Sequence, residues 1–177
     1  MIMPLNYRTL LPVVVLTLAT IAAPPTIAVS APVPTSPMQE FSFSRMGIGG
    51  IKLGMKASEV QRRLGKPLKM KSEKSPCCGV LLRWQYAEFE VRLEVPEGAN
   101  QERNASVYSI STRSAKVATL ENVRVGDRRS KVMQVYGTPS TTIQDRIFYS
   151  NDANASLLML RFKNDRVVEI IANTQLN

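Results

Sequence analysis

The fold is decided by two stretches, IKLGMKASEVQRRLGKP at residues 51–67 and VRVGDRRSKVMQVYGTP at residues 123–139. They align without a gap at a constant offset of 72 residues. Glycine, serine, valine, glycine and proline coincide in this alignment, an agreement that chance explains poorly. An internal repeat of this kind predicts that the chain builds one structural unit twice.

Each block predicts a short helix that ends at a glycine. In the first block Ala57, Val60 and Leu64 are three or four positions apart and form one apolar stripe. Gly65 stands where a helix favours a left-handed residue, and Pro67 prevents the helix from continuing. The second block repeats this pattern with Val132, Val135, Tyr136, Gly137 and Pro139.

Alternating apolar and polar residues after each block predict antiparallel strands. The alternation covers residues 82–86, 88–95 and 107–111 in the first unit, and residues 147–149, 157–163 and 166–172 in the second. We therefore predict an α+β fold of two tandem repeats, each a short helix packed on a three-stranded antiparallel β-meander. Because one such unit is very small, the two are expected to pack together.

The first thirty residues have the layout of a secretory signal peptide. Arg8 precedes an almost unbroken apolar run at residues 10–23, and small residues follow Pro24 and Pro25 at cleavage spacing. We predict cleavage after Ser30. An uncleaved anchor is the alternative, but this apolar run is shorter than the roughly 20 residues that a bilayer core needs.

The predicted organisation of the chain follows from this layout. It consists of a signal peptide at 1–30, a proline-rich linker at 31–40, a first repeat at 41–118 and a second repeat at 119–177. Cleavage would remove Arg8 alone among the charged residues and lower the formal net charge from +9 to +8.

Composition excludes several classes of chemistry. The 177 residues include 23 lysines and arginines, 14 acidic residues and no histidine. Catalysis by Ser-His-Asp or Cys-His groups and histidine-ligated zinc or iron are therefore excluded. The sequence also contains no phosphate-loop or nucleophilic-serine motif, so we predict no enzyme activity, no cofactor and no metal site. Because an exported protein rarely meets chromosomal DNA, we expect a protein partner or an anionic surface and no nucleic acid.

The helix motif resembles a known family. It combines an entry glycine, an apolar helix stripe, a closing Gly-x-Pro and an aromatic strand: Leu53, Gly54, Met55, Val60, Leu64, Gly65, Pro67, Trp84, Gln85 and Tyr86. This pattern looks like the SmpA/OmlA family, the BamE-like outer-membrane assembly lipoproteins. Two such units in tandem resemble the β-lactamase inhibitory protein (BLIP-like) architecture. Lys56 and Arg128 stand where the family usually has a capping Thr or Ser, and no Cys follows the apolar run.

The resemblance implies a function in binding proteins, because both groups act in that way. The leading hypothesis is a non-catalytic scaffold module of the periplasm or cell envelope. A secreted inhibitor of an enzyme is the second hypothesis, and an electrostatic binder of anionic membrane surfaces is the third.

One candidate protein-binding surface comes from strands that are apolar on both faces. The first repeat or the tail from Thr174 could cover the second face, or a partner could bind there. Trp84 and Tyr86 of the first repeat could likewise belong either to the core or to an interface. The candidate protein-binding residues are Trp84, Tyr86, Leu157, Met159, Val167 and Ile171.

A candidate anionic-surface site comes from the basic residues of the first helix and the stretch after it. These residues could dock on acidic lipid headgroups, or they could form an ordinary solvated loop. They are Arg62, Arg63, Lys66, Lys69, Lys71 and Lys74.

Cys77 and Cys78 are adjacent in a loop that the second repeat lacks. Export favours oxidation of both thiols. Neighbouring Cα atoms are about 3.8 Å apart, below the usual disulfide range of roughly 4.4–6.8 Å, so a bond between them is strained. A strained disulfide that stiffens the loop is our first interpretation, and an intermolecular bridge and a redox-responsive switch are the alternatives.

The signal-peptide hypothesis makes a direct prediction. Expression of the full chain in a bacterium with a general secretory pathway should yield an envelope protein whose first residue is Ala31. Mass spectrometry of the intact protein and of its amino-terminal peptide checks this. Recovery of Met1 on a membrane-embedded protein would instead establish the uncleaved anchor.

Overall fold

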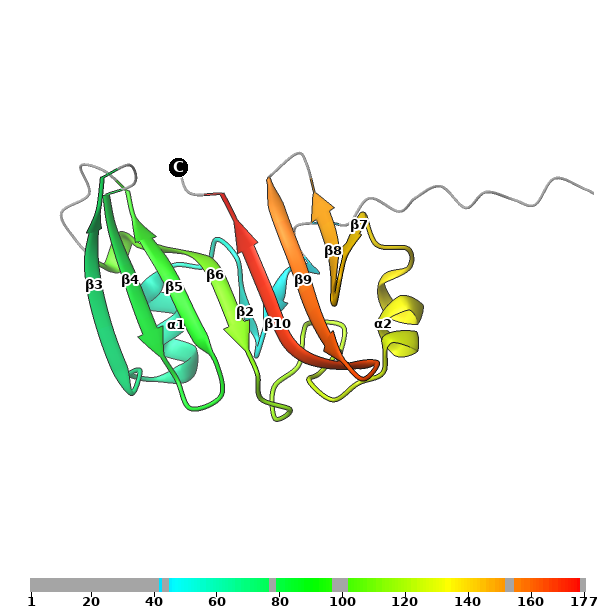
Figure 1. The fold of residues 1–177 in the computed structure, drawn as a ribbon. Helices are drawn as coiled ribbons and strands as arrows, with labels where there is room; N and C mark the ends of the chain where they lie inside the picture. The colour runs from blue at the N-terminus through cyan, green and yellow to red at the C-terminus, as the bar shows by residue number, and fades with distance from the viewer. Residues whose placement is uncertain (1–41, 43–44, 77–78, 97–101, 152–154, 176–177) are drawn as a thin grey trace, which may run out of the picture. The chain divides into compact units, whose positions relative to one another are not determined.

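Eight antiparallel strands form one continuous sheet (Figure 1). The computed structural model describes residue 42 and residues 45–76, 79–96, 102–151 and 155–175. The strand order is β3-β4-β5-β6-β10-β9-β8-β7, so two sets of four consecutive strands meet where β6 pairs with β10. The strands are β3 Lys69–Ser75, β4 Gly79–Gln85, β5 Glu90–Val95, β6 Ser106–Thr112, β7 Thr141–Ile143, β8 Arg146–Asn151, β9 Ser156–Lys163 and β10 Arg166–Thr174.

Two α-helices of eight residues each precede the two sets of strands. They are α1 (Ala57–Leu64) and α2 (Arg129–Tyr136). Each ends at a glycine with positive φ, 74° at Gly65 and 77° at Gly137, as the sequence predicts. Among the described residues, no helix is long and apolar enough to cross a bilayer.

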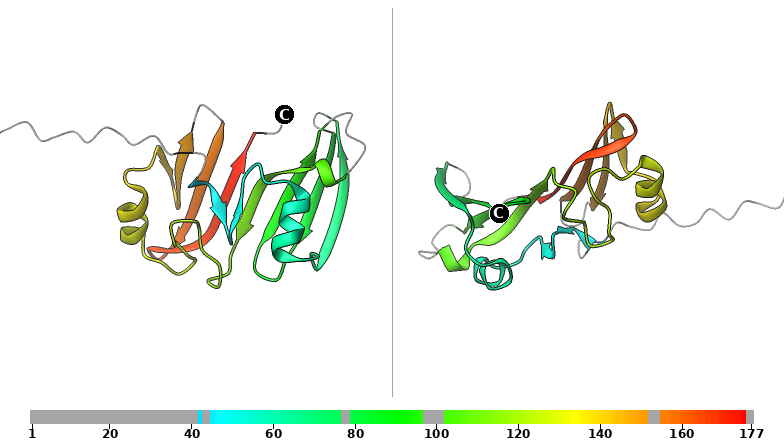
Figure 2. Two further views of the ribbon diagram at one scale, coloured as in Figure 1. Left: turned by 180° about the vertical axis from the view of Figure 1, so that it is seen from behind. Right: turned by 90° about the horizontal axis from the view of Figure 1, so that it is seen from below.

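Both helices lie on the same face of the sheet, together with a short hairpin (Figure 2). The hairpin joins β1 (Gly47–Ile48) to β2 (Ile51–Lys52), and a 3-10 helix at Glu102–Asn104 precedes β6. Alternate side chains of every long inner strand point to this face and form the hydrophobic core. Side chains of the hairpin and of the segment before it pack against them. The largest fully buried side chains of the core include Trp84, Tyr149, Met46, Ile48, Ile51, Leu93, Ile110, Leu160 and Ile170.

The predicted fold class is wrong. We expected two repeats, each a helix on a three-stranded meander, but the described strands form one eight-stranded sheet and a two-stranded hairpin, with two α-helices. Two edge strands were missed. β3 is polar and exposed over nearly its whole length, and β7 has only three residues, so neither shows an apolar alternation.

The pairing of β6 with β10 merges the two sets of strands. Thr112 lies opposite Ile170 and Ser109 lies opposite Asn173 at the ends of this pairing. On the helix side, Ile110 and Ala172 are opposite each other and fully buried. The core therefore continues through the seam, and the six inner strands of the sheet contribute to one hydrophobic cluster.

A continuous core predicts cooperative unfolding. Ile170→Ala, which removes a side chain that is 0% exposed at the seam, should lower the free energy of unfolding by about 2–5 kcal/mol. The adjacent substitution Ile171→Ala is the matched control, because Ile171 points to the other face and is only half-buried, and it should cost clearly less. Urea unfolding followed by far-ultraviolet circular dichroism checks both. Two separate transitions in the wild-type protein would contradict one continuous core.

Candidate functional site

The face of the sheet opposite the helices is the candidate site, and we call it the open face. Its side chains alternate with those of the core, and no described element packs over it (Figure 2). One row of cross-strand neighbours runs across this face through all eight strands. The row consists of Lys69, Gln85, Glu90, Ser111, Ile171, Met159, Phe148 and Thr141.

A group of apolar side chains lies on the part of the open face that β8, β9 and β10 form. Ile171, Met159 and Phe148 are consecutive members of the row on β10, β9 and β8. Leu157 lies two positions before Met159 on the same face of β9. We call these four residues the apolar strip. All four are half-buried by their neighbours and still reach solvent, so a partner could bury them further.

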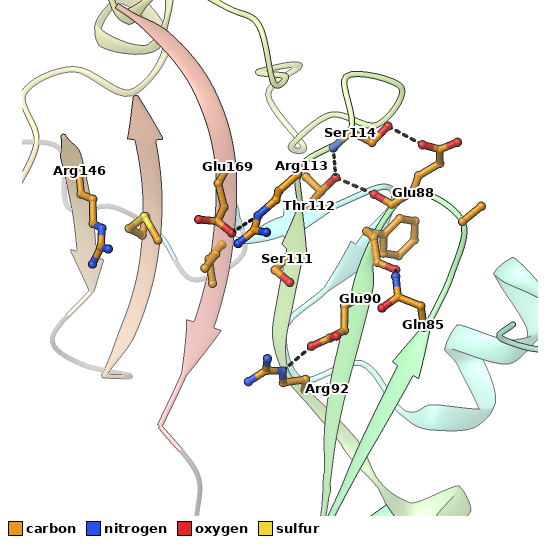
Figure 3. Close-up of a pocket in the computed structure, with 14 residues that line it drawn as sticks. Gln85, Glu88, Glu90, Arg92, Ser111, Thr112, Arg113, Ser114, Arg146 and Glu169 are labelled. Carbon is orange, nitrogen blue, oxygen red and sulfur yellow. Dashed lines mark hydrogen bonds and ion pairs between the residues drawn. The ribbon is translucent and has the colours of Figure 1, made fainter. Parts of the chain in front are cut away.

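A network of two arginines and one carboxylate lies beside the apolar strip. Glu169 of β10 accepts hydrogen bonds from Arg113 Nε at 2.6 Å and from Arg161 Nε at 3.0 Å. Partial burial of Glu169 opposes its ionisation, but the hydrogen bonds from the two arginines outweigh this effect and lower the pKa of the carboxyl. Figure 3 shows Arg113 and Glu169 meeting on the open face.

A second network lies on β4 and β5. Glu90 Oε1 is 2.6 Å from Arg92 Nε and 3.6 Å from Arg83 Nε. Burial favours the neutral form of Arg92, but the hydrogen bond to Glu90 outweighs it and raises the pKa of the guanidinium. Each network thus binds two arginines to one glutamate and retains one positive charge.

A hollow of about 760 Å³ lies between the two networks. Its lining comes from β4, β5 and β6 on one side of the seam and from β8, β9 and β10 on the other (Figure 3). Glu90, Arg92, Arg113 and Glu169 contribute charge to this lining, and Met159 contributes apolar surface. The hollow therefore combines paired charges with the apolar side chains of Met159 and Ile171.

Two of the acids at this hollow, Glu88 and Glu169, have lowered pKa values. Glu88 Oε1 is 2.9 Å from Lys116 Nζ, and Glu88 Oε2 accepts a hydrogen bond from Ser114. The bonds from Ser114 and Lys116 lower the pKa of Glu88, and the bond to Glu88 raises the pKa of Lys116. A general base at neutral pH needs a pKa near that pH, and these shifts are in the opposite direction. The arrangement suits binding of a charged surface more than proton transfer.

The six predicted protein-binding residues divide between the two faces. Leu157, Met159 and Ile171 lie together on the open face. Trp84 and Tyr86 point into the core on the helix side, 1% and 8% exposed. A partner that binds the folded protein does not reach them. Of the two alternatives, core or interface, these two aromatic residues therefore belong to the core.

Val167 also lies in the core, because a β-bulge changes the register of β10. The sequence alternation placed Val167 and Ile171 on one face, since they are an even number of residues apart. The bulge between Val167 and Glu169 inserts one extra residue. Val167 consequently shares the core face with Ile170 and is 1% exposed.

The residues of the predicted basic site lie at the end of α1 and on the edge strand β3. Arg62 and Arg63 are exposed on α1, and Lys66 is exposed just after it. Lys69, Lys71 and Lys74 belong to β3, so the predicted loop is wrong for these three lysines. Cys77 and Cys78 lie outside the described residues, and their disulfide stays a prediction. Among the residues the structure describes, no group of three His, Cys, Asp or Glu could hold a metal ion.

The charged networks of the open face were missed by the sequence analysis. The alternation over residues 88–95 predicts a strand with Glu88, Glu90 and Arg92 on one face, but it does not show which charges from other strands lie beside them. Strand alternation identifies which residues share a face but not which strands are neighbours. The distant partners Arg113 and Glu169 are 56 positions apart in the sequence and meet only because β6 pairs with β10.

Comparisons with known proteins leave the family open. No protein-family model matches the chain, and no curated protein matches it in sequence. The SmpA/OmlA resemblance therefore stays a prediction.

Three solved structures are similar to this chain. An extracellular protein containing a SCP domain from Bacillus anthracis str. Ames is 13% identical, with a TM-score of 0.44 over 68% of this chain and 43% of that one. A cysteine-rich secretory protein from Staphylococcus aureus subsp. aureus Mu50 is 8% identical, with a TM-score of 0.45 over 70% and 44%. A proposed beta-lactamase inhibitor protein from Streptococcus mutans is 12% identical, with a TM-score of 0.28 over 71% and 88%. This chain spans less than half the length of the first two, and TM-scores this low do not indicate a shared function.

The Glu169 network predicts a specific dependence of stability on pH. Glu169→Gln should lower the free energy of unfolding by about 1–3 kcal/mol at neutral pH, since it removes two charged hydrogen bonds. The folded pKa lies below the ordinary value of 4.5. The difference in free energy of unfolding between the wild-type protein and Glu169→Gln is therefore complete above that value. It is lost as the pH falls through the folded pKa. Urea unfolding at about pH 7, 5 and 3 measures it.

Arg146→Gln is the control for this experiment. Arg146 lies on the same face, and within the described part of the chain its only ion pair is with its neighbour Asp145, at 3.8 Å. Its removal should therefore change stability by less than about 1 kcal/mol at any of these pH values. A Glu169→Gln effect that stays the same from pH 7 to pH 3 would refute the assignment of the two arginine bonds.

Proposed function

We propose that this protein is an exported, non-catalytic module that binds another protein through the open face of its sheet. The observation that carries the proposal is the apolar strip next to two arginine–glutamate networks on a face that no described element covers. Apolar contacts flanked by arginines are typical of the energetic centre of a protein interface.

The size of the face supports a protein partner over a small ligand. Eight strands about 4.8 Å apart span roughly 34 Å, which matches the width of an ordinary protein interface. The hollow of about 760 Å³ lies within this width and spans the seam. A partner loop seated there would contact charged and apolar side chains together.

Export is part of the proposal and rests on the amino-terminal sequence. A module in the cell envelope or periplasm is our first choice, and its partner would be another envelope protein. A secreted inhibitor uses the same surface, and the identity of the partner would separate the two. Binding to an anionic membrane is the third alternative and would involve the basic residues from Arg62 to Lys74 instead.

Non-catalytic function is likewise proposed on chemical grounds. The sequence has no histidine, and the pKa values of Glu88 and Glu169 are lowered away from neutrality. A lowered pKa favours the ionised form of both carboxylates at neutral pH, which suits recognition of a charged partner.

Site-specific crosslinking tests the proposed surface. A photoreactive amino acid at position 159 should crosslink one defined protein in intact envelopes of the source cell, because Met159 lies in the centre of the apolar strip. The same amino acid at position 133 is the matched control, since Met133 is an exposed methionine on α2, on the other side of the sheet. Mass spectrometry identifies the product.

A substitution then measures the importance of the strip. Met159→Glu should weaken binding of the identified partner at least tenfold, while Met133→Glu should leave it within about twofold. Equal crosslinking from both positions, or equal affinity of both variants, would eliminate the open face as the binding surface.

A further inference from the structure

The outer edge of β3 is a second surface with distinct chemistry. β3 pairs with β4 along its whole length of seven residues, and β4 is its only neighbour in the described sheet. Residues 69–74 are all exposed, so no described element packs against the outer side of the strand. An edge strand of this length offers a row of backbone N–H and C=O groups to an added strand.

The lysines of β3 have no partner among the described residues, unlike the arginines of the two networks. Lys69, Lys71 and Lys74 make no side-chain hydrogen bond or ion pair with other described residues. Against Glu73 alone, they give β3 a net charge of +2. On the open face, by contrast, Arg92 and Arg113 are each 2.6 Å from a glutamate.

The two faces of the edge differ in character. Lys69 and Lys71 are opposite Gln85 and Arg83, so they lie on the open face. Met70 is opposite Trp84, so it lies on the helix side, where it is 50% exposed. Leu68, two positions before Met70, is 72% exposed. Over residues 68–71 the edge therefore presents lysines on one face and large apolar side chains on the other. Beyond them, Glu73 lies on the open face and Lys74, opposite Val80, lies on the helix side.

The geometry points to a partner of matching pattern: we propose that β3 accepts an extended segment of an acidic protein by strand addition. Acidic side chains of this segment would alternate with apolar ones. In an added strand, successive side chains point to opposite faces. Acidic residues would thus meet Lys69 and Lys71, while the residues between them would pack on Met70 and Leu68.

Other features of the edge agree with this partner. A hollow of about 380 Å³ beside β3 is lined by three basic side chains, Lys71, Arg83 and Arg92, and by one acidic side chain, Glu73, so its lining has a net positive charge that favours a carboxylate. Two copies of β3 would bring like net charges together, which opposes self-pairing. The opposite edge, β7, has only three residues and no charged side chain. It is therefore too short to pair with a long added strand, and it has no charge with which to select an acidic one.

A synthetic peptide provides the test. The probe is a capped, fluorescently labelled peptide of seven residues in which glutamate and valine alternate, and binding to the full protein is followed by fluorescence anisotropy. A permuted peptide of the same composition, with its glutamates grouped together, should bind at least tenfold more weakly. Binding of the alternating peptide should also weaken as salt is raised.

Backbone pairing is tested on the wild-type protein, so no variant has to fold. Two versions of the alternating peptide carry N-methyl groups on the even or on the odd amides. A strand pairs through every second amide, so one version should lose binding and the other should retain it. Equal binding by both versions, or no binding of the unmethylated peptide, would overturn the proposal.

Charge recognition is tested with a matched pair of double variants. K69E/K71E should reduce peptide affinity at least tenfold. K52E/R103E changes the net charge equally at exposed positions outside β3 and should reduce it less than threefold. Circular dichroism and the thermal midpoint confirm the fold of each variant. Equal losses in both variants would show that net charge alone is responsible and would overturn the assignment to β3.

Two alternative occupants have distinct signatures. Vesicles of phosphatidylglycerol and phosphatidylcholine that bind the protein through Lys69 and Lys71, without peptide binding, would assign the edge to a membrane. A dimer in sedimentation that K69E/K71E dissociates would assign it to a second copy. Either result would overturn the proposal. Met159→Glu should retain peptide binding, so failure of the open-face proposal and failure of this one are distinguishable.

Discussion

The pairing of β6 with β10 is the interaction on which the other features of the described chain depend. Each of these strands would be an unpaired edge if the two sets of four strands were separate. Their pairing lets Ile110 and Ala172 close the core across the seam. It also aligns the open face into one surface and brings Arg113 to Glu169. The remaining edges of the described sheet are then β3 and β7, which is why the exposed length of β3 matters.

Local signals predicted the local structure well. Both helices end at the glycines that the repeat analysis identified, and the turn at Asn164 and Asp165 has the positive φ values, 51° and 60°, of a tight hairpin turn. The β3 strand had no such signal. Its sequence KMKSEKS faces solvent on both sides, so it lacks the apolar alternation that marks a half-buried strand. The merged sheet could not be predicted either, because strand pairing across the seam depends on contacts between distant segments.

The candidate site was predicted in part, for a similar reason. Apolar residues on both faces of β9 and β10 indicated a surface needing cover, and Leu157, Met159 and Ile171 do lie on the open face. Alternation alone could not decide which face of β4 carries the helices, so Trp84 was included although it is core. Val167 was misplaced because a bulge reverses the alternation, and a bulge of this kind leaves little trace in sequence.

The two proposed surfaces differ in how their charges are held, and this difference should govern how they recognise partners. The arginines of the open face are oriented by Glu90 and Glu169, so their planar guanidinium groups are fixed before a partner arrives. Such a surface selects by shape and by the geometry of its hydrogen bonds. The lysines of β3 are exposed and without partners among the described residues, so they act as mobile point charges. Their attraction works at longer range and is screened by salt, which suits β3 to guiding a flexible acidic segment onto an edge whose backbone then fixes its register.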